Sequence, residues 1–181
     1  MSDINFKPWV GSNYYNSHFG VKVLILGESH YADPEDEVGE DWTQYVVRQN
    51  GMNVPNSFFT RTAKAVLGLT AEQALSDVER ADLWGHVAFY NYIQEIVGTE
   101  GRIRPTKAMW ESAPTAFNEV IETLKPDVIV VLGSELGEWI PEVDGCIEMA
   151  FIHHPSYGGF SYESNNPVIQ DALLKAKTKK G

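Results

Sequence analysis

The stretch Val21-Lys-Val-Leu-Ile-Leu-Gly-Glu-Ser-His-Tyr31 decides the fold. Its first six residues are apolar except for one lysine and rich in β-branched side chains, and Gly27 ends the run. A run of this length and composition is typical of a buried parallel strand. Three later runs share the pattern and are predicted to be strands: Val87–Tyr92, Asp127–Leu132 and Cys146–Ile152.

Capping residues and periodic apolar positions predict helices between these strands. The strand and helix segments alternate, which predicts an α/β fold: a three-layer α/β/α sandwich around a mostly parallel four-stranded sheet. The predicted helices are Trp42–Arg48, Ser57–Leu67, Ala71–Glu79 with Thr70 as cap, Pro114–Leu124, Ser134–Ile140, and a last one with Asn166 as cap and Pro167 in its first turn.

Length and composition restrict the class of protein. A chain of 181 residues suits one domain with its own core, so we expect a single domain over 1–181 with a frayed tail at Lys175–Gly181. One cysteine, Cys146, excludes an internal disulfide and a cysteine-based zinc or iron–sulfur site. No apolar run approaches the roughly 18 residues of a membrane span, and the first residues lack a secretory signal pattern. We therefore expect a cytoplasmic monomer with no membrane partner.

Polar side chains follow the ends of several predicted strands. Gly27-Glu28-Ser29-His30-Tyr31 comes after the first strand, Asn91 ends the second, and His153-His154-Pro155-Ser156-Tyr157 follows the fourth. Ligands of open parallel sheets bind at the carboxyl ends of the strands. We therefore expect these residues to share one rim of the sheet.

Each of these groups has a functional and an ordinary interpretation. Glu28 and His30 can move protons or stabilise a cation, or Glu28 can cap a backbone group in a solvated loop. Adjacent His153 and His154 point to opposite faces of a strand, so at most one faces the site. That one suits hydrogen bonding to a developing anion better than metal binding. Asn91 offers a donor and an acceptor to a nucleobase edge, although an Asn at a strand end is more often a turn residue.

Several short motifs occur in a fixed order from Val21 to Phe160. This order resembles the uracil-DNA glycosylase superfamily, and the resemblance implies that family's fold. The motifs are Gly27-Glu28-Ser29-His30-Tyr31, Val54-Pro55-Asn56-Ser57 before a helix, Asn91 after an apolar strand, Arg104-Pro105, Lys125-Pro126-Asp127 before a strand and its Gly-Ser turn, and His154-Pro155-Ser156 with Gly159-Phe160 behind it.

The resemblance implies an enzyme that flips uracil or another, modified base out of DNA and hydrolyses its N-glycosidic bond, with no metal or other cofactor. His154 then donates to the departing base, and Glu28 positions water or stabilises the sugar cation. His30 departs from the family pattern, because it replaces the usual proline, and we expect it to add a proton carrier. By position, catalysis is assigned to Glu28, Ser29, His30 and His154, base binding to Gly27, Tyr31 and Asn91, and DNA contacts to Ser156, Tyr157, Arg102, Arg104 and Lys107.

Ser29 stands where the best-known branch of the family has a catalytic aspartate, and serine is no general base at neutral pH. We therefore expect Glu28 to do this work, as in the Gly-Glu-Ala-Pro-Gly branch. Two alternatives remain open. One is a non-catalytic nucleotide or nucleic-acid binder on the same fold. The other is an SGNH-type serine esterase using Ser29 with His153 or His154, although the Asp expected about three residues before that His is absent.

Net charge weighs against general attraction to nucleic acid, because 14 Lys and Arg face 25 Asp and Glu, for a charge of −11. The acidic residues gather in 33–41, 72–79, 111–122 and 135–148, whereas Arg102, Arg104 and Lys107 share one loop. If that loop lines the site, an acidic protein can still hold phosphate locally. We therefore expect DNA as the partner, bound at one place.

Overall fold

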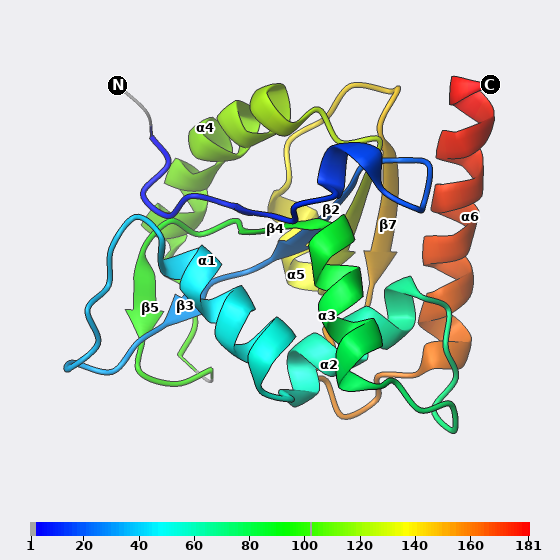
Figure 1. The fold of residues 1–181 in the computed structure, drawn as a ribbon. Coiled ribbons are helices and arrows are strands. Elements are labelled where there is room, and N and C mark those ends of the chain that lie inside the picture. Colours follow the sequence, from blue (N-terminus) through cyan, green and yellow to red (C-terminus); the bar gives the residue numbers. More distant parts are fainter. Residues whose placement is uncertain (1–2, 102) are drawn as a thin grey trace.

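A five-stranded sheet forms the centre of the computed structural model, which describes residues 3–101 and 103–181 (Figure 1). Four strands run parallel, and a short first strand pairs antiparallel at the edge. The predicted α/β class and mostly parallel sheet are confirmed, with one strand more than expected. In spatial order the strands are β1 (Trp9–Val10), β4 (Ala88–Asn91), β2 (Val23–Gly27), β6 (Val128–Leu132) and β7 (Glu148–Ile152).

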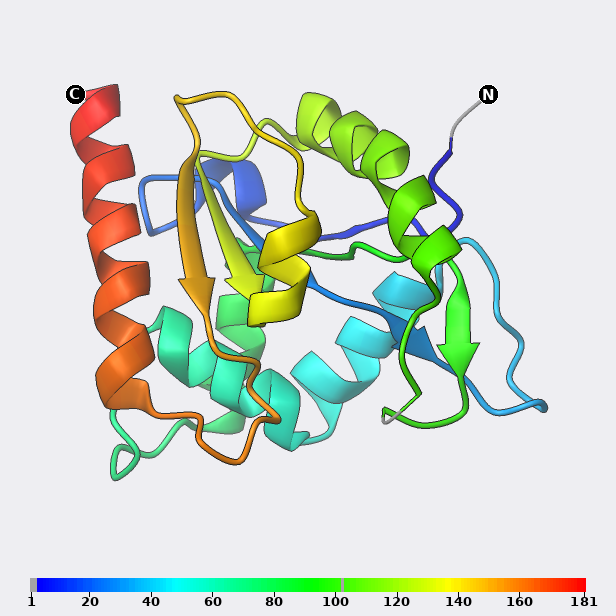
Figure 2. The ribbon, with the colours of Figure 1, turned by 180° about the vertical axis from the view of Figure 1, so that it is seen from behind.

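Alternating residues of the central strands belong to two separate hydrophobic clusters. Val23 and Ile25 of β2 pack on one side of the sheet, and Leu24 and Leu26 pack on the other, because successive strand side chains point to opposite faces. The first cluster includes helices α1 (Trp42–Val47), α2 (Ser57–Val66), α3 (Asp77–His86) and α6 (Tyr162–Lys180). The second includes α4 (Lys107–Leu124) and α5 (Ser134–Trp139), which lie in front of the sheet in Figure 2.

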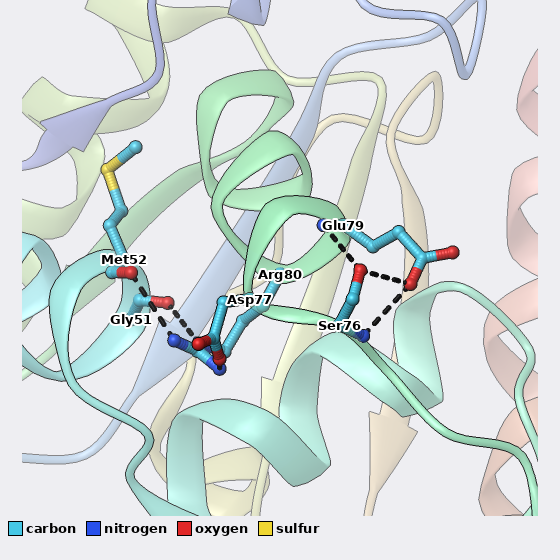
Figure 3. A network of polar contacts seen from close by, with 6 residues as sticks. All are labelled: Gly51, Met52, Ser76, Asp77, Glu79 and Arg80. Carbon is cyan, nitrogen blue, oxygen red and sulfur yellow. Dashed lines mark hydrogen bonds and ion pairs between the residues drawn. The ribbon is translucent and has the colours of Figure 1, made fainter.

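The position of α3 corrects a predicted helix. We expected Ala71–Glu79 with Thr70 as cap, but the helix begins at Asp77. Ser76 is its cap: its hydroxyl accepts the N–H of Glu79, and the Glu79 carboxylate accepts the N–H of Ser76 at 2.9 Å (Figure 3). This reciprocal pair satisfies two donors that a helix start leaves free.

The two long helices also differ from their predicted bounds. α4 starts at Lys107, where Thr106 caps it, and carries Pro114 inside the helix. α6 starts after Ser161 and continues to Lys180, so the predicted frayed tail is wrong. Lysines near its end pair with carboxylates where two strands begin: Lys179 with Glu148 of β7 at 2.6 Å, and Lys180 with Asp127, just before β6, at 2.7 Å. These contacts hold the last turns against the sheet.

Short irregular elements were not predicted. They are a 3-10 turn η1 (Tyr14–Asn16), a π-helical segment η2 (Arg48–Asn53), and a separate two-stranded parallel sheet of β3 (His30–Tyr31) and β5 (Ile96–Gly98). η2 and β3 lie beside the carboxyl end of the main sheet and contribute to the cavity below. Over the described residues, no helix has the length and apolar character needed to cross a membrane.

Candidate active site

A cavity of about 680 Å³ opens beyond the carboxyl ends of β2, β4 and β7. The loops that follow these strands line it, together with α1, α2, η2 and the segment before α4. Most residues predicted for the site meet here. They are Glu28, Ser29, His30, Tyr31, Asn91, Arg104, His154, Ser156 and Tyr157.

His154 has a defined orientation and tautomer. Its Nδ1 accepts the backbone N–H of Ser156 at 3.1 Å, so the single proton of the neutral ring is on Nε2. Burial, and then the positive charge of Arg104, lower the pKa of His154 below its usual value. At neutral pH the ring is therefore an uncharged donor in the cavity. Its face lies 5.3 Å from the ring of Phe58, centroid to centroid.

The loop that carries His154 is tied down from two helices. Arg61 of α2 donates to the carbonyl oxygen of Pro155 at 2.8 Å, and Asn165 of α6 accepts the backbone N–H of His153 at 2.9 Å. Asn165 is buried and also donates to Ser161. As predicted for adjacent histidines, His154 lines the cavity whereas His153 is exposed and contacts the Tyr157 ring at 5.9 Å.

Asn91 is held by the first strand's loop. Its Nδ2 donates to the carbonyl oxygen of Ser29 at 3.1 Å. The two residues after it extend the parallel ladder, since the N–H groups of Tyr92 and Ile93 donate to Gly27 and Glu28 at 2.9 Å. Gly27 of β2 is paired with Asn91 of the neighbouring strand β4, and a Cβ at Gly27 would overlap Oδ1 of the Asn91 amide. Glycine is therefore needed here for close packing, and Asn91 keeps one orientation.

Glu28 forms an ion pair at the cavity wall. Its side chain is only 11% exposed, and its Oε2 lies 2.6 Å from Nη2 of Arg104. Arg104 also pairs with Glu135 of α5. The predicted basic residue is thus at the rim, but two carboxylates offset its charge. Glu28, Arg104 and Glu135 thus form one cluster of ion pairs at the cavity wall.

Ser29 and Tyr31 form a short polar chain. The Ser29 hydroxyl lies 3.2 Å from Tyr31 Oη, which donates to the carbonyl oxygen of Ile103 at 3.2 Å. Oε1 of Glu28 lies 3.5 Å from the same hydroxyl. Among the hydrogen bonds of the described residues, none joins Ser29 to an imidazole, so the nucleophile–base pair of a serine esterase is not assembled.

The His30 side chain is buried, and its surroundings do not favour proton transfer. Nε2 contacts the Thr43 hydroxyl at 2.7 Å, and the edge of the ring meets Phe6. Burial lowers the pKa of His30 to about 3, so the ring is neutral at neutral pH. We expected a proton carrier at this position; the surroundings instead suit a residue that fixes the loop to α1.

The predicted DNA-contact residues lie in different surroundings. Ser156 and Tyr157 are exposed at the cavity, and Tyr157 packs over Gly159. Lys107 does not line the cavity and pairs with Glu111 one helical turn away at 3.2 Å. Arg102 lies outside the described residues.

One group of cavity-lining residues, with aromatic and amide side chains, was not predicted for the site from the sequence. It consists of Trp42, Phe58, Phe59, Phe89, Asn50 and Asn56. The aromatic residues have ordinary core spacing, so only the fold shows that they face a cavity. Asn56 follows Pro55 and caps α2 by accepting the N–H of Phe58 at 3.0 Å, and this cap was predictable.

Asn50 reaches the cavity from η2, and a buried arginine fixes that segment (Figure 3). Arg80 of α3 is 2% exposed and donates to the carbonyl oxygens of Gly51 at 2.9 Å and Met52 at 3.3 Å. Asp77 balances its charge at 2.6 Å. π-helical turns are often found at functional sites, and here the turn places Asn50 in the lining of the cavity.

Comparison with known proteins adds no assignment: no family model matches the chain, and no curated protein does.

Proposed function

We propose that the chain is a DNA glycosylase, a hydrolase that cleaves the N-glycosidic bond of a flipped uracil or modified base, on a fold of the uracil-DNA glycosylase type. The observation that carries the proposal is the hydrogen bond of His154, whose Nδ1 accepts a backbone N–H, so that the proton of the neutral ring is on Nε2. Within the described residues, no hydrogen bond uses this Nε2–H, and His154 lines the cavity. A neutral donor of this kind stabilises negative charge as it develops on a leaving group.

The cavity suits a planar base in size and chemistry. About 680 Å³ lies within the range of small-ligand pockets. Phe58 and Tyr31 supply aromatic surface, and the amide of Asn91 supplies a hydrogen-bonding edge in one fixed orientation. A sheet with helices on both faces, and the site beyond its strand ends, agree with the resemblance in the sequence.

The chemical step follows from these positions. The bond between the sugar C1′ and the base nitrogen breaks, and its electron pair leaves with the base. Nε2–H of His154 donates to the oxygen of the base anion, and the Glu28 carboxylate stabilises the cationic sugar. Water oriented by Glu28 adds to C1′ and releases one proton to solvent, and the free base takes up one proton from solvent. His30 holds the loop and transfers no proton.

A second function is favoured by the ion pair of Glu28. Because Arg104 contacts this carboxylate at 2.6 Å, Glu28 is partly neutralised in the arrangement seen here. A protein that binds a base without cleaving it needs no free carboxylate. Turnover separates the two functions, since the binder retains DNA and forms no abasic site.

The test is a panel of duplex and single-stranded oligonucleotides that carry uracil, hypoxanthine, xanthine or oxidised pyrimidines. We expect alkali-labile abasic sites with at least one base, and a loss of at least about 100-fold in Glu28→Gln and His154→Ala. Glu122→Gln, the same change on the exposed side of α4, is the matched control and should keep full activity.

Two results would count against the enzyme. Saturable binding of the panel with no abasic site from any base would support the non-catalytic binder. Labelling of Ser29 by a fluorophosphonate, absent in Ser29→Ala, would support an esterase.

A further inference from the structure

A cluster of metal-ligating side chains lies outside the cavity. Among the described residues, one group of three such side chains has all its ligand atoms within 4.8 Å of one another: His18, Asp82 and His86. Asp82 and His86 are four residues apart on α3 and so share a helix face. His18 comes from the loop before β2, 68 residues away in sequence from His86.

The separations are close to those of a bound transition metal. Nδ1 of His18 lies 3.8 Å from one Asp82 oxygen, and Nε2 of His86 lies 3.7 Å from the other. Bonds of about 2.0–2.2 Å in tetrahedral geometry place ligand atoms about 3.3 Å apart. Each His–Asp pair therefore has to close by about half an ångström. The three ligand atoms lie within 4.8 Å of one another, so the widest separation has to close further, and exposed Asp82 has the freedom to move.

The backbone on both sides of the cluster is already ordered. A turn closed by the Gly20 N–H to the Ser17 carbonyl at 2.9 Å carries His18, and Gly20 at its last position has a positive φ. His86 is half-buried at the end of α3, and the two imidazole rings lie 4.1 Å apart.

We propose that His18, Asp82 and His86 bind a divalent transition metal of the zinc class, with solvent completing the coordination. Two imidazoles and one carboxylate are ligands that such ions prefer, whereas Mg²⁺ and Ca²⁺ prefer sets made of oxygen. The ion would join the 17–20 loop to the end of α3.

The carboxylate of Asp82 faces both imidazole rings. A metal ion satisfies both rings and the carboxylate at once. The charge of Lys177 of α6 acts on His18 and opposes metal binding.

Binding changes one hydrogen bond in a way that can be observed. Nδ1 of His86 accepts the backbone N–H of His18 at 3.2 Å, and Nε2 of the same ring lies 3.4 Å from Nδ2 of Asn13. A metal at Nε2 requires the proton of the neutral ring to be on Nδ1. The His18 N–H then loses its acceptor, and the loop has to adjust.

This site is independent of the proposed glycosylase. His86 lies two residues before Ala88, where β4 begins, so the cluster is at the amino end of the sheet. The cavity lies at the opposite, carboxyl end. Loss of metal binding therefore leaves the proposal for the cavity untouched, and loss of base release leaves the metal site untouched.

Calorimetric titration of the full chain with ZnCl₂ tests the site, with backbone amide NMR as a second readout. We expect one equivalent to bind, a rise in melting temperature with added zinc, and a change of the His18 amide signal. Exposed His18→Ala and Asp82→Asn should each weaken binding at least about tenfold. Neither residue lies in the core, so both variants should remain folded.

Two control variants change other side chains to which zinc could bind. Cys146→Ser removes the exposed thiol, and Glu122→Gln repeats the charge change of Asp82→Asn on another helix. Both should bind zinc like the parent chain. The proposal is overturned if zinc does not bind at millimolar concentration, or if binding survives His18→Ala and Asp82→Asn but is lost in Cys146→Ser.

Discussion

Two histidines in the cavity are kept neutral by burial, and each contacts a different partner. His154 accepts a backbone N–H and presents its own N–H to the cavity, whereas His30 contacts Thr43 inside the protein. The first arrangement is suited to chemistry and the second to rigidity. Protonation disrupts both, because the charged ring has to be accommodated where burial disfavours it.

Acid should destabilise the fold through His30. Its pKa is about 3 in the folded chain and 6.5 in the unfolded chain, so between these values the unfolded chain binds the extra proton. The free energy of unfolding should therefore fall by about 1.4 kcal/mol per pH unit below pH 6.5 from this residue. Urea denaturation at pH 6.5 and 5.0 checks this. His30→Gln should lose about 2 kcal/mol less over that interval, and an unchanged loss would refute the assignment.

Gly27→Ala should disable the cavity without removing any polar group from it. The new Cβ overlaps Oδ1 of Asn91 and displaces the amide. We expect base release to fall at least about 100-fold, with a cost in unfolding free energy of about 1–3 kcal/mol from overpacking. Gly158→Ala, in the exposed loop after Tyr157, meets no atom within 4 Å and should change neither quantity. Equal activity of the two variants would show that the Asn91 orientation is unimportant.

At the level of elements, η2 depends on one buried arginine. Arg80→Met leaves the carbonyl oxygens of Gly51 and Met52 without their donor and Asp77 without its partner. We expect the free energy of unfolding to fall by about 3 kcal/mol. Asp77→Asn, which changes the exposed partner, should cost about 1 kcal/mol or less. Urea denaturation distinguishes these values, and similar costs for both variants would contradict a role for Arg80 in holding η2.

The strands and the loops after them could be predicted because their composition is decisive. β2 and β6 are continuous apolar runs, and the polar motifs at the ends of β2, β4 and β7 were expected on one rim. β1 and β3, with two residues each, are too short for any periodicity. The start of α3 was missed because Thr70 is an equally good cap in sequence, and the reciprocal Ser76–Glu79 pair decides between them only in the fold.

The residues of the cavity also divide into two groups. Some could be predicted from local sequence, and others depend on contacts between distant segments. Glu28, Asn91 and His154 were predicted from strand ends. Phe58 faces the cavity because of how α2 packs, and the pairing of Arg104 with Glu135 joins segments 31 residues apart. His18 and His86 come together across a longer separation still. Such contacts depend on tertiary packing, which one sequence does not reveal.

For the molecule as a whole, charge should limit DNA binding to few phosphates. The net charge is −11, and Arg104 at the rim is offset by Glu28 and Glu135. We expect the logarithm of the association constant to fall against the logarithm of salt concentration with a slope of about −1 to −2. Glu135→Gln should tighten binding about two- to fivefold, because it removes one competitor for the guanidinium. Fluorescence anisotropy measures both, and a slope steeper than about −4 would indicate a larger basic surface.

Release of free base from DNA tests most directly whether His154, Asn91 and Glu28 act on one nucleotide. Mass spectrometry of single-turnover reactions detects the base itself and so separates a glycosylase from a nuclease. We predict stoichiometric release of one base of the panel by the parent chain, and at least about 100-fold slower release by His154→Ala. Undiminished release by His154→Ala, or no free base from any bound oligonucleotide, would contradict the proposed chemistry.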